Sequence, residues 1–248
     1  MAHPYGRAAA ASRYRSGHFA RPGDGTRTWG RAGTLGQDGG VQLTPITWPR
    51  LAEALAERLA STEPPGPWWR VAVDGAPAAG TADLADALAN ELPALGHPVL
   101  RVAAAGFWRP ASQRLEYGHQ DADAYYQLWL DTGALRREVL EPLGPGGTGR
   151  ALPSLRDPRS DRSTRADYVQ LPPGGVLVLD GPLLLGQGLP LDLTVHLRLS
   201  RAALERRTPR EQRWTLPAYD RYAREVLPEE AADVLVRADD PRHPAWSG

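Results

Sequence analysis

The sequence lacks lysine and cysteine altogether and has one methionine and two phenylalanines among its 248 residues. Without cysteine there is no disulfide, no thiolate zinc site and no thiol nucleophile, which is compatible with a reducing compartment. All 29 basic residues are arginine, and 29 acidic residues bring the formal charge to zero. No global field therefore attracts a nucleic acid or a membrane surface.

Long apolar runs are also missing, since no stretch approaches the roughly 18 residues of a membrane span. The N-terminus carries Arg and Gly where a secretory signal needs an apolar run. The sequence predicts a soluble, cytoplasmic protein with a small-molecule ligand and without nucleic-acid or membrane partners. Its oligomeric state stays open, with a homo-oligomer among the options.

Composition changes along the chain and predicts three regions. Residues 1–44 are rich in Gly, Ala and Arg without a period, which is typical of a disordered extension. Residues 45–240 contain the periodic apolar segments of one folded domain, and residues 241–248 are predicted as a C-terminal tail.

Short apolar strands alternate with amphipathic helices in residues 45–240. Helical spacing is clear after Thr47, after Gly80, and in the residues 201–208 and 217–227, and the residues 124–143 are predicted as one long helix. The predicted strands are 70–74, 98–103, 176–181, 193–199 and 233–237. This alternation predicts an α/β fold in three layers, a parallel sheet flanked by helices, of the phosphate-loop kinase type.

One glycine loop stands between the first of these strands and the helix that follows. Its residues, which we predict as nucleotide-binding, are Gly75, Ala76, Pro77, Ala78, Ala79, Gly80, Thr81 and Ala82. In a phosphate loop the backbone N–H groups hold phosphate, a lysine reaches the outer phosphates and a hydroxyl binds Mg²⁺. Here Thr81 stands at the lysine position and Ala82 at the hydroxyl position. The alternative is an ordinary strand-to-helix turn.

A carboxylate ends the apolar strand 176–181. Phosphate-loop enzymes place an acid there to hold Mg²⁺, directly or through water, so Asp180 is the candidate catalytic and metal-binding acid. The alternative is a turn aspartate before Gly181.

Several short motifs, in order, resemble the uridine kinase family of phosphate-loop nucleoside kinases. They are the 71–80 loop, Gly106-Phe107-Trp108-Arg109-Pro110, Asp123-Ala124-Tyr125-Tyr126, Leu140-Glu141-Pro142-Leu143, Val178-Leu179-Asp180-Gly181 and Ala232-Asp233-Val234-Leu235-Val236. The resemblance implies transfer of the γ-phosphate of ATP or GTP to a hydroxyl of a nucleoside or similar small molecule, with Mg²⁺. It also implies a substrate site at Phe107, Arg109, Tyr125 and Tyr126, and an arginine-bearing lid that includes Arg207 as a catalytic residue.

The sequence departs from the family at the positions that carry out the reaction. Thr81 and Ala82 replace the lysine and the hydroxyl, and Gly106 stands where the family has the acid that accepts the substrate proton. Several residues are candidates to replace the missing groups. The arginines 206–213 are candidates for the cation, and Asp74 or Asp83 for binding Mg²⁺. The candidates for the base are Asp121, Asp123, Asp131 and Asp157. The alternative function is a pseudokinase that binds a nucleotide, a nucleoside or a protein partner without catalysis.

Overall fold

The structure is a computed structural model that describes residues 42–248. Most of the predicted extension, residues 1–41, lies outside the described residues. Within the described part of the chain, no helix is both long and apolar enough to cross a bilayer.

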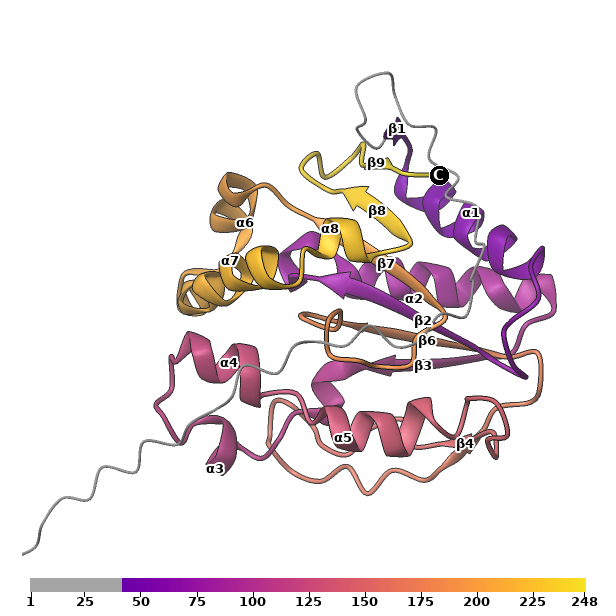
Figure 1. Ribbon diagram of the computed structural model, residues 1–248, viewed down its shortest axis with the longest axis horizontal. Helices are drawn as coiled ribbons and strands as arrows, with labels where there is room; N and C mark the ends of the chain where they lie inside the picture. Colours follow the sequence, from indigo (N-terminus) through magenta and orange to yellow (C-terminus); the bar gives the residue numbers. More distant parts are fainter. Residues whose placement is uncertain (1–41) are drawn as a thin grey trace, which may run out of the picture. The chain divides into compact units, whose positions relative to one another are not determined.

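A seven-stranded sheet forms the centre of the described domain, in the order β1-β9-β8-β7-β2-β6-β3 (Figure 1). The five strands from β8 to β3 are parallel, and β9 and β1 add to the β8 edge in antiparallel pairing. The strands are β1 (Thr44–Pro45), β2 (Trp69–Gly75), β3 (Val99–Ala103), β6 (Val176–Gly181), β7 (Leu193–Arg198), β8 (Val234–Arg237) and β9 (Ala245–Trp246), with β4 (Arg150–Ala151) and β5 (Val169–Gln170) as a separate ribbon.

Helices cover both faces of the sheet, as the sequence predicted. They are α1 (Trp48–Ala60), η1 (Pro77–Ala79), α2 (Thr81–Glu91), η2 (Leu92–Leu95), η3 (Ala104–Phe107), α3 (Ala111–Arg114), α4 (Ala122–Leu128), α5 (Thr132–Leu135), η4 (Arg136–Leu140), α6 (Arg201–Arg207), η5 (Arg210–Thr215), α7 (Leu216–Glu225) and α8 (Pro228–Ala231). The predicted α/β fold with a mostly parallel sheet is therefore confirmed.

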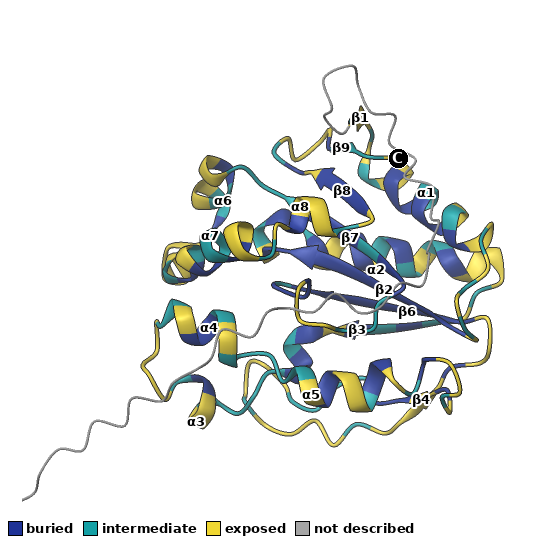
Figure 2. Cartoon of the chain, viewed as in Figure 1, coloured by how far each residue is buried: buried dark blue, intermediate teal, exposed yellow. Residues whose placement is uncertain are grey.

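Side-chain alternation along the central strands divides the core into two layers. Val71 and Val73 of β2 pack with the leucines of α1 and α2, whereas Ala72 faces the cluster that includes Leu135 and Leu140. All residues of β2 and β6 are buried, and both strands lie wholly in the buried class in Figure 2. This is why they appear in the sequence as continuous apolar runs rather than alternating ones.

The predicted helix 124–143 is wrong as a single element. Leu130 forms an isolated β-bridge with Trp108, and Asp131 then caps α5 by accepting a hydrogen bond from the Ala134 N–H at 2.9 Å. Three residues, 129–131, therefore separate α4 from α5. The aromatic spacing of Tyr125 and Trp129 hides this break in the sequence, because it continues the helical period.

The C-terminal residues extend the sheet beyond the predicted boundary at residue 240. Ala245 and Trp246 pair with β8 on one side and with Thr44 and Pro45 on the other. A two-residue strand has no period of its own, so the sequence showed only a tail.

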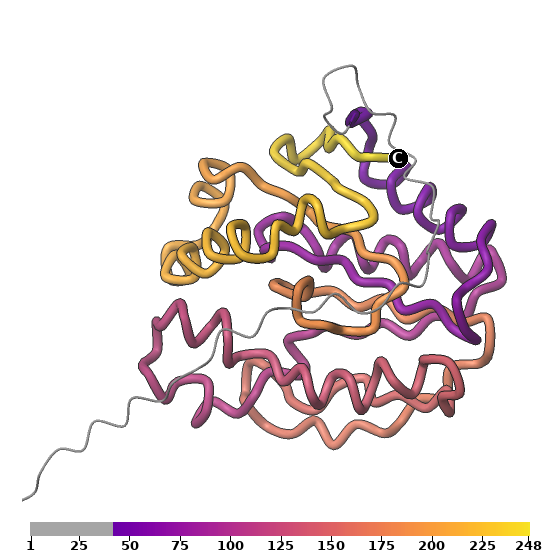
Figure 3. The backbone as a smooth tube through the Cα atoms, viewed as in Figure 1, coloured from indigo at the N-terminus to yellow at the C-terminus, as the bar shows by residue number. Residues whose placement is uncertain are grey.

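A long excursion connects η4 to β6 and runs along the α5 side of the domain (Figure 3). Leu152 donates its N–H to the Glu138 carbonyl at 2.9 Å, and Tyr168 donates its hydroxyl to the Glu138 carboxylate at 2.7 Å. The N–H groups of Leu155 and Arg156 both donate to the Gly106 carbonyl at 3.0 Å. The excursion is thereby fixed against the end of β3.

Candidate functional site

The glycine loop lies at the carboxyl end of β2, between the ends of β6 and β7. Gly75 pairs with Leu197, and its neighbour Asp74 pairs with Gly181. Because parallel strands end at the same edge, the loop, Asp180 and the end of β7 come together there, which is where open α/β sheets bind ligands.

The loop is a tight turn with part of its hydrogen bonding already used. Ala79 donates its N–H to the Ala76 carbonyl at 2.8 Å, and Gly80 donates to the Pro77 carbonyl at 3.0 Å. Gly80 then takes a left-handed conformation at φ +86° and begins α2. Within residues 42–248, the N–H groups of Ala78, Thr81 and Ala82 donate to no acceptor in the protein. These donors at a helix N-terminus suit an anion.

Gly75 allows the close passage of two strands at the start of the loop. It has φ +146°, and a Cβ there would lie 2.6 Å from the Leu197 carbonyl oxygen.

We expect Gly75→Ala to lower the free energy of unfolding by about 2 kcal/mol or more, because the backbone would have to move. Denaturant unfolding measures this. Gly96→Ala is the matched control: φ is +85° with nothing within 4 Å, so only the conformational cost of about 1 kcal/mol applies. Equal losses in the two variants would contradict the close-packing argument.

Thr81 is turned into the protein rather than toward a ligand. The whole residue is 2% exposed, and its Cγ2 lies 3.2 Å from a Cβ built on Gly75. A residue in this orientation does not reach outer phosphates. Ala82 is exposed and has no hydroxyl.

Asp180 is where the sequence predicted it, at the end of β6, and it is ion-paired. Its Oδ1 accepts a hydrogen bond from Arg101 Nη1 at 2.7 Å, and the Nε of the same arginine donates to Asp86 on α2 at 2.8 Å. Arg101 was not among the site residues predicted from the sequence. A usable signal was present, because a charged residue inside the apolar strand 98–103 needs a partner.

Mg²⁺ does not fit the residues that are present. Ala82 offers no oxygen, the Asp180 carboxylate holds a guanidinium, and no group of three or more His, Cys, Asp or Glu side chains in residues 42–248 is placed to hold a metal ion. Divalent cations such as Mg²⁺ need several oxygen ligands.

Asp74 belongs to a buried hydrogen-bonded network and not to a metal site. Its side chain is 0% exposed. Its Oδ1 accepts from the Leu184 N–H at 2.8 Å, and its Oδ2 accepts from Tyr222 at 3.0 Å and lies 2.7 Å from His196 Nδ1. Tyr222 in turn accepts from the Leu185 N–H at 3.0 Å. This network joins the residue before the loop to β7, to α7 and to the segment after β6.

The four residues predicted to bind substrate occupy different environments. Phe107 is fully buried in the core. Arg109 is half-buried, and its buried Nε has no hydrogen-bond partner within residues 42–248. The Tyr126 hydroxyl lies 3.2 Å from Glu225, and the Arg221 guanidinium lies 4.5 Å from its ring centroid.

Tyr125 lies in an aromatic cluster between α4, η5 and α7, which also includes Trp129, Trp214 and Tyr219. Its ring meets Trp129 edge-on at 5.0 Å and Trp214 at 5.6 Å, and its hydroxyl lies 3.0 Å from that of Tyr219. The rings thus contact one another, a geometry that favours packing of α4 against α7.

Burial raises the pKa of Tyr125 to about 12, with the Tyr219 hydrogen bond opposing the shift. A pKa that is higher in the folded state gives stability below pH 10, which is lost as the pH rises from 10 to 12. The full loss is about 3 kcal/mol for this group. We expect the free energy of unfolding of Tyr125→Phe, measured by urea titration, to fall less steeply between pH 10 and 12 than that of the unmodified chain. Tyr117→Phe, at a 65% exposed position, should leave this slope unchanged. Identical slopes for all three proteins would contradict this role for Tyr125.

Arg207 is held by the backbone after β8. Its guanidinium donates to the carbonyls of Ala238, at 2.8 Å, and Asp239, at 2.5 Å. Arg206 and Arg210 are exposed, and no hydrogen bond or ion pair holds their side chains within the described residues. Their guanidinium groups are therefore free to bind an anion. The helix α6 also contacts η1 of the loop.

The candidate replacements for the missing base have local structural roles. Asp121 and Asp131 cap α4 and α5, Asp123 pairs with Arg221 at 3.0 Å, and Asp157 accepts the Arg159 N–H at 2.8 Å. The position of Gly106 is itself covered, since a Cβ there would lie 3.0 Å from Ser154 Cβ.

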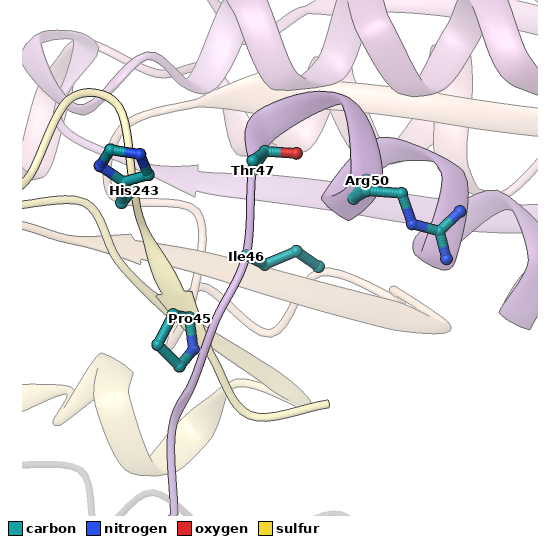
Figure 4. A pocket seen from close by; sticks show the side chains of 5 residues that line it. All are labelled: Pro45, Ile46, Thr47, Arg50 and His243. Atoms are coloured by element: carbon teal, nitrogen blue, oxygen red, sulfur yellow. The ribbon is translucent and has the colours of Figure 1, made fainter.

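A separate pocket lies beside the start of α1, lined by Pro45, Ile46, Thr47, Arg50 and His243 (Figure 4). Arg50 is ion-paired with Glu53, and His243 Nδ1 lies 3.6 Å from Asp240. None of the five residues is a predicted site residue, and no set of polar groups converges in the pocket.

Comparison with known proteins agrees with the fold. A structure of a possible uridine kinase from Bacillus stearothermophilus matches with a TM-score of 0.60 and 19% identity, over 75% of this chain and 97% of the other. A protein described as a fructose transport system kinase, from Silicibacter sp. TM1040, matches with a TM-score of 0.50 and 25% identity, over 76% and 90%. No protein-family model and no curated protein matches the sequence. The fold is thus similar to that of phosphate-loop kinases.

Proposed function

We propose that this chain uses a kinase fold to bind a phosphate-bearing nucleoside ligand and does not carry out metal-dependent phosphoryl transfer. One observation carries the proposal. At the mouth of the loop the anion-binding N–H groups remain, while the side chains that would act on the transferred phosphate are absent, buried or paired.

Binding is supported by donors and charge around the loop. The N–H groups of Ala78, Thr81 and Ala82 are available, and the positive end of the α2 dipole adds to them. Arg206 and Arg210 lie on α6 and η5, without partners in the described part of the chain. Arginine binds phosphate through two parallel hydrogen bonds, so these side chains suit the outer phosphates of ATP or GTP.

Phosphoryl transfer needs groups that this site lacks. The reaction depends on positioning and charge stabilisation, and each missing group costs orders of magnitude in rate. Thr81 is buried, Asp180 is held by Arg101, and Gly106 has no side chain and is covered by Ser154.

The second candidate is a uridine kinase-like phosphotransferase that passes the γ-phosphate of ATP or GTP to a nucleoside hydroxyl. The contact between α6 and η1 favours it, because this contact brings an arginine-bearing segment to the loop. In this case an arginine replaces the missing lysine.

Calorimetry on the full chain separates the two candidates. ATP, GTP, uridine and cytidine are titrated one at a time, and each donor and acceptor pair is then assayed for ADP or GDP release with and without Mg²⁺. We expect heat of binding for a nucleotide and no turnover. Turnover in any pair establishes the second candidate, and no binding of any ligand overturns both.

A charge change at the loop tests where the ligand binds. Ala82→Glu places a carboxylate at the exposed first turn of α2, and we expect it to weaken nucleotide binding by about tenfold or more through repulsion of the phosphates. Asn90→Glu is the control, since it adds the same charge at the other end of α2. If both variants bind as the unmodified chain does, the ligand lies elsewhere.

A further inference from the structure

Three charged side chains from three elements meet beside the loop. Arg101 of β3 donates from Nη1 to Asp180 of β6 at 2.7 Å and from Nε to Asp86 of α2 at 2.8 Å. The same Nη1 also donates to the Val102 carbonyl at 2.8 Å. We name Asp86, Arg101 and Asp180 the charge triad.

The charge triad lies where a phosphate loop would hold its metal. Ala82, at the position of the metal-binding hydroxyl, and Asp86 are four residues apart on α2 and therefore share one face, one turn apart. Asp180 is the last residue but one of β6, the strand that pairs with β2 before the loop. The guanidinium thus lies between the acid and the helix face that together would surround Mg²⁺.

Burial distinguishes the two ion pairs of the charge triad. The side chains of Arg101 and Asp180 are 24% and 11% exposed, whereas Asp86 is 63% exposed. The exposed Asp86 pair contributes little to stability, because water and salt screen it. The pair with Asp180 is shielded, and an arginine does not lose its proton in proteins. A metal ion would have to displace a permanent positive charge to reach Asp180.

We propose that Arg101 substitutes for the divalent cation at Asp180, so that the site binds phosphate-bearing ligands without metal. Asp180 then has no metal affinity of its own until Arg101 is removed. Removal of Arg101 leaves the carboxylates of Asp86 and Asp180 facing the space that its guanidinium filled. Divalent cations prefer such oxygen ligands. The statement about metal stands by itself, and the statement about phosphate ligands rests on the proposed function.

Manganese tests the first statement without any nucleotide. Mn²⁺ is titrated into the full chain and free Mn²⁺ is followed by electron paramagnetic resonance. We expect the unmodified chain and Asp180→Asn to bind Mn²⁺ equally, and Arg101→Gln to gain affinity by about tenfold or more. The double variant Arg101→Gln with Asp180→Asn should lose that gain.

Two results overturn this statement. One is an unmodified chain that binds Mn²⁺ more tightly than Asp180→Asn, which means that Asp180 already holds metal. The other is a folded Arg101→Gln, by circular dichroism, with no gain. If Arg101→Gln does not fold, the comparison of the unmodified chain with Asp180→Asn still decides.

ATP tests the second statement. The affinity of the unmodified chain should be the same in EDTA and in Mg²⁺, and Arg101→Gln should weaken binding in EDTA by about tenfold. Binding that requires Mg²⁺ overturns the metal-free site. An absence of ATP binding under both conditions counts against the proposed function, while the Mn²⁺ titrations still decide the role of Arg101.

Discussion

Asp192→Ala is expected to lower the free energy of unfolding by about 3–5 kcal/mol, because it leaves the buried Arg70 guanidinium without its partner. Arg70 donates from Nε and Nη2 to the two carboxylate oxygens of Asp192 at 2.8 and 2.7 Å, and its backbone N–H donates to the same carboxylate at 3.0 Å. The two side chains are 8% and 1% exposed. Denaturant unfolding followed by circular dichroism measures the loss.

Asp123→Ala is the matched control for this effect. Asp123 pairs with Arg221 at 3.0 Å but is 81% exposed, so the same change should cost about 1 kcal/mol or less. A double variant, Arg70→Leu with Asp192→Leu, should recover most of the stability because no charge is left buried. A loss in Asp192→Ala no larger than in Asp123→Ala would show that water reaches Arg70.

The second large effect is expected at Asp74. Asp74→Ala removes an acceptor from the Leu184 N–H, from His196 Nδ1 and from the Tyr222 hydroxyl. Hydrogen bonds to a charged group are worth about 1.5–3 kcal/mol each, so we expect a loss of at least about 3 kcal/mol. Because Asp74 directly precedes Gly75, the loop should lose its fixed position as well.

Two measurements separate this network from simple cavity formation. Tyr222→Phe keeps the ring and removes one hydroxyl, and should cost about 1–3 kcal/mol. In Asp74→Ala, hydrogen exchange should accelerate in α7 and at Leu184 and Leu185 more than in α1, which the network does not touch. Uniform acceleration over the whole domain would argue that Asp74 does not tie these segments together.

The central strands were predictable because burial on both faces leaves a continuous apolar run in the sequence. Residues 70–74 and 176–181 were found for this reason, and the glycine loop followed from its place between strand and helix. The order of these elements also predicted that the loop and Asp180 would meet, since parallel strands end at one edge.

Short elements and long-range pairs were not predictable in this way. The break at Leu130 comes from a bridge to Trp108, and β9 is defined by its pairing with β8 and β1. Two residues carry no period, so only their partners in space give them a structure.

The candidate site shows the same division. By its residue types, the sequence alone determined the fold, the frame of the loop, and the absence of a lysine, a hydroxyl and an acid at Thr81, Ala82 and Gly106. The tertiary structure alone decided that Asp180 pairs with Arg101, that Asp74 is sealed in a network and that Arg207 is held by backbone carbonyls. The physical reason is that residue types and periods follow from local sequence, whereas the partner of a charged side chain depends on which distant segments the packed sheet brings within hydrogen-bonding distance.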